Sequence, residues 1–98
     1  MVKNALEEIK TYLETYTFLR AEVRYESWSS SETYEGDNLE DFKMFMSRVN
    51  YDSGFGSQEL FGTIYLKDRH GKPIWLTRGE YDGSEWWDVN RVPEFYKE

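Results

Sequence analysis

The chain contains no cysteine and a single histidine, His70, among its 98 residues. The absence of cysteine excludes disulfides, thiol nucleophiles and thiolate metal sites, and one imidazole excludes centres built on several histidines. No stretch approaches the roughly 18 consecutive apolar residues that a membrane span needs. The N-terminal sequence MVKNALEEIK is charged and lacks the apolar centre of a signal peptide. We therefore expect a cytoplasmic protein without membrane attachment.

Basic side chains are the minority charge, with 12 Lys and Arg against 19 Asp and Glu and a formal net charge of -7. Nucleic-acid binding depends on clustered Lys and Arg that neutralise phosphates. Direct binding of DNA or RNA is therefore not expected. A negative surface favours solubility or a basic protein partner.

The length and the aromatic content together predict one domain spanning residues 1–98. Phe, Tyr and Trp make up 18% of the chain. Because each of these rings can bury roughly 150–250 Å², one compact core is expected although only 39% of the residues are hydrophobic.

The spacing of apolar residues changes along the first forty positions. In residues 2–16 the apolar side chains recur at steps of three and four, which predicts an amphipathic helix. From Phe18 to Glu26 they alternate with charged residues, which predicts a half-buried strand. Residues 27–41 (SWSSSETYEGDNLED) are rich in Ser, Gly, Asn and Asp, which predicts a long exposed loop.

The segment 42–50 fits two structures. Its first apolar residues alternate as in a strand, but a helix with Asp37 or Asn38 as N-cap also fits. We favour a strand because Met44 and Phe45 would spread apolar groups around a helix. A Gly and Ser turn segment follows, as between paired strands.

The C-terminal half predicts three consecutive strands, at residues 59–67, 73–81 and 85–92, with short turns between them. The step Asp82-Gly83 between two alternating aromatic segments is a strong hairpin signal, since glycine tolerates positive φ. The predicted fold class is therefore α+β, with an N-terminal amphipathic helix packed on an antiparallel four- or five-stranded meander sheet.

Aromatic residues concentrate in the last two predicted strands. Consecutive strand residues point to opposite faces, so either Trp86 or Trp87 must lie away from a helix-covered core. An aromatic there either fills a second cluster or anchors an interface, where Trp and Tyr are enriched. Gly62 and Gly79 indicate bulges or places where a ring covers the backbone. The candidate partner-binding aromatic patch consists of Trp75, Tyr81, Trp86 and Trp87.

The histidine, the glycine-rich segment and the acidic residues are of types that often form catalytic, phosphate or metal sites, but their sequence contexts do not favour such sites. His70 lies in the polar turn DRHG and is expected to be solvated. The segment Gly54–Ser57 lacks the lysine and the strand-to-helix setting of a phosphate loop. The acidic residues lack the spacing of a calcium loop. We expect no catalytic residue, metal or cofactor, while a carboxylate pair acting on a glycoside stays as an enzymatic alternative because its separation depends on the fold.

Carboxylates gather in two segments and form the candidate acidic surface for a partner, although a solvated charged loop is the simpler interpretation of the first segment. The first segment holds Glu32, Glu35, Asp37, Glu40 and Asp41, and the second holds Asp82, Glu85 and Asp88.

The sequence LFGTIYLKDRHGKPIWLTRGEYDGSEWWDVNRVPEFY, within residues 60–96, resembles small proteins of T-even-type phages, in particular the Arn-type anti-restriction nuclease proteins. The likeness rests on ten residues: Gly62, Asp68, Trp75, Arg78, Tyr81, Asp82, Gly83, Glu85, Trp86 and Trp87.

The resemblance implies a non-enzymatic counter-defence protein, compact or dimeric. Its acidic surface would imitate the phosphates of DNA and occupy the DNA-binding domain of a nuclease of the McrBC class. Because 12 basic residues dilute the carboxylates, such mimicry requires a homodimer or charge gathered on one face. The alternative is an acidic interaction module or an anti-CRISPR-type inhibitor anchored by the aromatic patch.

Overall fold

The computed structural model describes residues 2–52 and 57–93 and has an α+β fold. In chain order the elements are β1 (Val2–Asn4), α1 (Ala5–Thr15), β2 (Thr17–Glu26), β3 (Ser31–Gly36), α2 (Leu39–Ser47), β4 (Asn50–Asp52), β5 (Leu60–Lys67), β6 (Pro73–Tyr81) and β7 (Ser84–Arg91).

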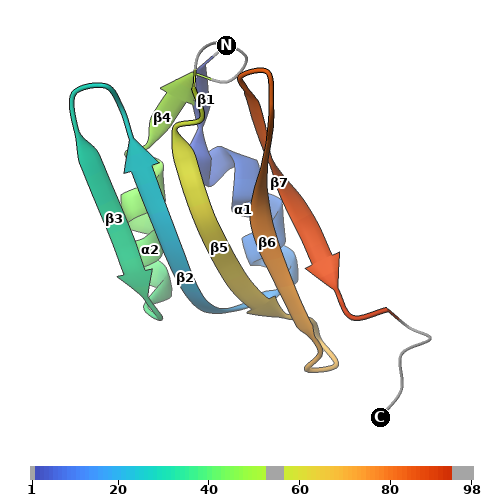
Figure 1. Ribbon diagram of the computed structural model, residues 1–98. Helices are drawn as coiled ribbons and strands as arrows, with labels where there is room; N and C mark the ends of the chain where they lie inside the picture. The colour runs from blue at the N-terminus through green and yellow to red at the C-terminus, as the bar shows by residue number, and fades with distance from the viewer. Residues whose placement is uncertain (1, 53–56, 94–98) are drawn as a thin grey trace.

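Five strands form one antiparallel sheet in the order β3-β2-β5-β6-β7, and β1 pairs with β4 in a small second sheet. The last three strands form the expected meander, while β2 and β3 form a separate hairpin beside β5. Both helices lie behind the same face of the large sheet, so its other face is uncovered (Figure 1).

Helix α1 begins three residues later than the apolar spacing predicts. The side chain of Asn4 accepts hydrogen bonds from the backbone N–H groups of Leu6 and Glu7, both at 3.1 Å, and so caps the helix. Residues before this cap pair with β4, with Val2 opposite Asp52. Val2 is consequently exposed and does not join the buried stripe of the helix.

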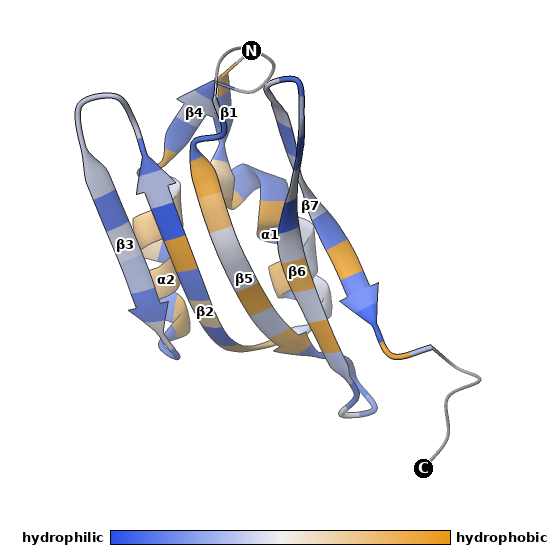
Figure 2. Cartoon of the chain, in the orientation of Figure 1, coloured by the Kyte–Doolittle hydropathy of each residue, from blue (hydrophilic) through white to orange (hydrophobic). Residues whose placement is uncertain are grey.

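The prediction of a loop over residues 27–41 is wrong for most of its length. Residues 31–36 form β3, which pairs with β2 along the sheet edge. Most residues of β3 are hydrophilic (Figure 2), and most of its side chains are exposed to solvent. The strand therefore lacks the apolar alternation that would have predicted it from the sequence. Tyr34 is its inward-facing residue and packs on Phe42, with ring centroids 5.5 Å apart.

The strand favoured for residues 42–50 is also wrong, because the helical alternative is the one that forms. Asn38 caps α2 by accepting a hydrogen bond from Asp41 N at 2.9 Å. Phe42, Phe45 and Met46 are buried in the core. Met44, which argued against a helix, simply faces solvent.

Two glycines in the sheet allow close contacts that a side chain would prevent. Gly62 has φ +134°, and an added Cβ would lie 2.0 Å from the carbonyl oxygen of Glu22 on β2. The sheet's irregularity is in β2, between Phe18 and Arg20, and not at Gly62. The Trp86 ring lies over Gly79, where a Cβ would be 2.4 Å from the indole nitrogen.

The turn between β6 and β7 has the predicted geometry. Asp82 and Gly83 have φ values of +53° and +88°, the left-handed conformation that Asp-Gly hairpins adopt. This turn therefore sets the register of the two strands that carry all four residues of the candidate aromatic patch.

Candidate functional site

The uncovered face of the sheet carries three members of the candidate aromatic patch. Ile74 and Leu76 are buried under the helices, so the alternate residues of β6, including Trp75 and Tyr81, point away from the core. Trp86 of β7 pairs with Gly79 of β6 and therefore lies on the same uncovered face. Its indole N–H donates to Asp88 at 3.0 Å.

Trp87 does not belong to this patch, because it lies on the covered face and is only 9% exposed. The prediction that the two adjacent tryptophans divide between the faces is confirmed. The guanidinium of Arg78 lies 4.7 Å from the centroid of the Trp87 ring and covers it in a cation–π contact.

Glu85 was expected on the acidic surface, but it is 1% exposed and lies inside the protein. Its carboxylate accepts a hydrogen bond from Arg78 Nη2 at 2.7 Å and two from the backbone N–H groups of Glu59 and Leu60, at 2.7 and 3.1 Å. The Arg78 side chain is itself 2% exposed. Because buried charges need such partners, Glu85 holds β5, β6 and β7 together and does not face a partner.

The buried ion pair extends toward α1. Arg78 Nη1 lies 4.0 Å from a carboxylate oxygen of Glu8, and Lys3 Nζ lies 3.7 Å from the other oxygen. The hydroxyl of Tyr51 donates to Glu8. Burial and this hydrogen bond raise the pKa of Tyr51 above its usual range. Two cations thus face two carboxylates, so the network adds no net charge to the surface nearby.

The acidic residues of the 32–41 segment do not share one surface. Glu32 lies at the start of β3, whereas Glu35 lies near its other end, 3.5 Å from Arg20. Asp37 precedes α2, and Glu40 and Asp41 lie in the helix's first turn. Carboxylates stabilise a helix N-terminus through its dipole, which gives Glu40 and Asp41 a structural role.

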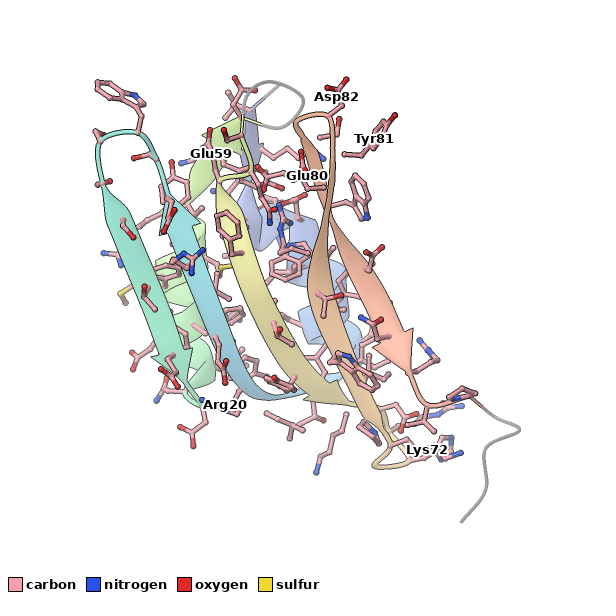
Figure 3. All side chains as sticks on the ribbon, viewed as in Figure 1. Arg20, Glu59, Lys72, Glu80, Tyr81 and Asp82 are labelled. Atoms are coloured by element: carbon pink, nitrogen blue, oxygen red, sulfur yellow. The ribbon has the colours of Figure 1, made fainter. Side chains whose placement is uncertain are left out.

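Carboxylates do converge at the end of the sheet that holds the β2–β3 and β6–β7 hairpins. We call this region the acidic end. Figure 3 shows three of its members, Glu59, Glu80 and Asp82, near one another at this end. The β2–β3 hairpin and β4 lie at the same end (Figure 1). The full set is Glu26, Glu32, Asp52, Glu59, Glu80 and Asp82.

Burial, together with neighbouring carboxylates, raises the pKa of two groups at or beside the acidic end. Burial, followed by the charges of Glu85 and Asp52, raises the pKa of Glu59, although a backbone hydrogen bond from Asp52 opposes the rise. Burial and the charges of Glu59 and Glu32 raise the pKa of Tyr25. Arg24 lies 2.8 Å from Glu26 and forms an ion pair with it.

The opposite end of the meander carries a small group of cations. Lys67, Arg69 and Lys72 surround the turn between β5 and β6, where Figure 3 places Lys72. The carboxylate of Asp68 accepts hydrogen bonds from the backbone N–H groups of His70 and Lys72, and these lower its pKa. His70 is exposed in this turn, as its sequence context predicts.

Sequence reasoning missed most of the acidic end because its members come from separate segments. Of its six members only Glu32 and Asp82 are among the predicted site residues, and Glu26, Asp52, Glu59 and Glu80 are not. The signal that could have found them is position, since each lies at or beside a strand end. The pairing of β2 with β5 brings those strand ends together.

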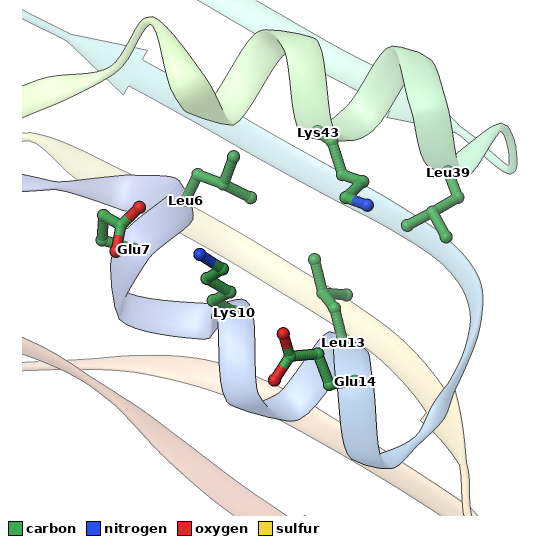
Figure 4. Close-up of a pocket in the computed structure, with 7 residues that line it drawn as sticks. All are labelled: Leu6, Glu7, Lys10, Leu13, Glu14, Leu39 and Lys43. Atoms are coloured by element: carbon green, nitrogen blue, oxygen red, sulfur yellow. The ribbon is translucent and has the colours of Figure 1, made fainter.

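A groove lies between the two helices (Figure 4). Leu6, Leu13 and Leu39 give it an apolar floor, and Lys10 and Lys43 lie at its rim. Across residues 2–52 and 57–93, no three acidic or histidine side chains are grouped to hold a metal ion. Gly54, considered for phosphate binding, lies outside the described residues.

Comparisons with protein-family models, with curated proteins and with solved structures found no match to this chain. In the part of the chain that the structure describes, neither helix has the length and apolar character needed to cross a membrane. The arguments for function therefore rest on the arrangement of its own side chains.

Proposed function

We propose that this protein is a non-enzymatic inhibitor that binds a DNA-binding defence nuclease, in the cytoplasm of a phage-infected bacterium. The observation that carries the proposal is the gathering of carboxylates from four separate segments at the acidic end. A nuclease cleft evolved to hold phosphates attracts such a surface. The resemblance of residues 60–96 to Arn-type anti-restriction proteins supports a target of the McrBC class.

A net charge of -7 is modest for a DNA mimic, but the charges of this protein are segregated, which concentrates negative charge at one end. The buried Arg78 network is balanced, and the cations of the β5–β6 turn lie at the far end of the sheet. The acidic end of a single chain is thus more negative than the average of the protein. A homodimer would add to this charge but is not required by the argument.

The test measures binding of the purified protein to the DNA-binding domain of a McrBC-class nuclease at several salt concentrations. A DNA mimic should lose affinity steeply as salt rises and should compete with a modified DNA duplex. Binding that resists salt, or that leaves DNA binding by the domain unchanged, would contradict mimicry.

A matched pair of variants locates the surface. The acidic-end variant combines four substitutions: Glu32→Gln, Glu59→Gln, Glu80→Gln and Asp82→Asn. The control removes the same number of exposed charges elsewhere, with Glu14→Gln, Glu22→Gln, Asp37→Asn and Asp88→Asn. Surface charge pairs contribute about 0.2–1 kcal/mol each, so we expect the loss of four carboxylates to weaken binding about fourfold or more at low salt. Equal losses in the two variants would show that the acidic end is not the binding surface.

A second candidate is a protein-binding module that uses the uncovered sheet face. Trp86 is 38% exposed and Tyr65 36% exposed on this face, without a helix above them. Burying such rings can anchor an interface whose affinity depends little on salt. Trp86→Ala would then abolish partner binding, while the acidic-end variant would retain it.

A further inference from the structure

Two aromatic side chains at the acidic end are largely exposed to solvent. Trp28 is 99% exposed and lies in the turn between β2 and β3. Tyr81 is 77% exposed and is the last residue of β6, beside the turn into β7. Both hairpins end on the same side of the sheet (Figure 1), and Figure 3 shows Tyr81 beside Asp82 there.

The turn that carries Trp28 is closed by its own hydrogen bonds. The backbone N–H of Ser27 donates to the carbonyl of Ser30 at 2.9 Å. The hydroxyl oxygen of Ser27 accepts from the backbone N–H groups of Ser29 and Ser30, at 3.4 and 3.1 Å. The indole is thus presented on an ordered turn, so a partner that buries it need not first close that turn.

The two rings and the carboxylates lie close enough to act on one partner. One strand, β5, separates the two hairpins in the sheet. With strands about 4.8 Å apart, the hairpin axes are roughly 14 Å apart. Glu59 directly precedes β5, the strand between the two hairpins, and Glu32 lies on β3 within the first hairpin, opposite Tyr25 of β2.

We propose that Trp28 and Tyr81 are the aromatic anchors of the acidic end, and that the surface they frame docks on an arginine-bearing cationic protein surface. This inference rests on the proposed function, because it names the chemistry of the partner that the acidic end binds. Carboxylates attract either basic residue, but guanidinium groups stack on Trp and Tyr faces better than ammonium groups do. Within the described residues, guanidinium groups already lie over rings in three contacts: Arg24 over Phe61, Arg78 over Tyr51 and Arg78 over Trp87.

The test compares binding of oligoarginine and oligolysine peptides of equal length to the full chain. We expect wild type to bind oligoarginine more tightly. Trp28→Ala and Tyr81→Ala should each weaken oligoarginine binding about two- to fivefold, and the double variant should lose the arginine preference. Oligolysine binding and the salt dependence should stay unchanged. Because both rings are exposed, neither substitution should alter thermal unfolding. Met44→Ala, which removes an exposed apolar side chain from α2, is the control.

The proposal is overturned if wild type binds the two peptides equally, or binds neither, or if the double variant keeps the arginine preference. The proposed function fails separately, if the acidic-end variant and wild type bind the nuclease domain equally. An arginine preference that depends on both rings, with no nuclease binding, would keep the docking chemistry and reject the defence nuclease as the partner.

Discussion

Removing the carboxylate of Glu85 is expected to destabilise the protein severely, although sequence reasoning placed this residue on an exposed binding surface. In Glu85→Ala the buried Arg78 guanidinium loses its 2.7 Å partner, and two backbone N–H groups lose their acceptor. Removing one member of a buried ion pair costs about 3–5 kcal/mol. Glu8, 4.0 Å from Arg78 Nη1, offers partial compensation, so we expect about 3 kcal/mol.

The assay is equilibrium unfolding in urea, followed by tryptophan fluorescence. A domain of this size has a total stability of about 5–15 kcal/mol, so the loss should shift the midpoint strongly without changing the slope. Glu85→Gln keeps the shape and one acceptor oxygen but loses the charge, and we expect about 2 kcal/mol.

Asp88→Asn is the matched control, because Asp88 is an exposed carboxylate on the same strand. Its substitution should cost less than about 0.5 kcal/mol. If Glu85→Ala costs less than about 1 kcal/mol, or no more than the control, the buried ion pair does not hold the three strands together as argued.

Three further predictions concern the sheet, the core and pH. Gly62→Ala should cost about 3 kcal/mol or more, because its Cβ would meet the Glu22 carbonyl at φ +134°; a neutral result in urea unfolding would contradict the close approach. Ile9→Ala should cost about 2–5 kcal/mol, since Ile9 is fully buried; near-wild-type stability would show that α1 does not pack in the core. Folding raises the pKa of Glu59. The contribution of Glu59 to the free energy of unfolding is therefore most favourable below the ordinary pKa of a glutamate and falls as pH rises through the raised pKa. Glu59→Gln should therefore gain stability relative to wild type as pH rises from acid to neutral, and parallel melting curves across that range would contradict this.

The sequence predicted the elements whose pattern is local and repeated. The three C-terminal strands alternate over eight or nine residues, and Asp82-Gly83 between two of them permits one turn conformation. The predictions for residues 31–36 and 42–50 were wrong because these segments have no long, repeated local pattern. Short segments fit more than one period, and the choice depends on packing: Phe42 is buried against Phe18, with ring centroids 5.0 Å apart, a contact between distant parts of the chain.

The acidic end could not be found from runs of acidic residues, because a run follows one strand or helix, whereas a surface crosses several. Glu32 and Asp41 belong to one run, yet they lie at the start of β3 and in the first turn of α2. Glu26 and Glu59 lie far apart in the chain, but Glu26 N donates to the Glu59 carbonyl at 2.8 Å. Strand pairing, and not sequence composition, determines which carboxylates lie close enough together to form one negative surface.

The burial of Glu85 and the exposure of Asp88 could have been argued from strand alternation and the hairpin register. Glu85 and Trp87 share one face of β7, and Trp86 and Asp88 share the other. Whichever tryptophan enters the core therefore brings a carboxylate with it, and a buried carboxylate needs a cation. Arg78 lies opposite Trp87 in the hairpin register, on the face that Glu85 shares. The buried tryptophan had to be Trp87, because only its face offers an arginine across the hairpin.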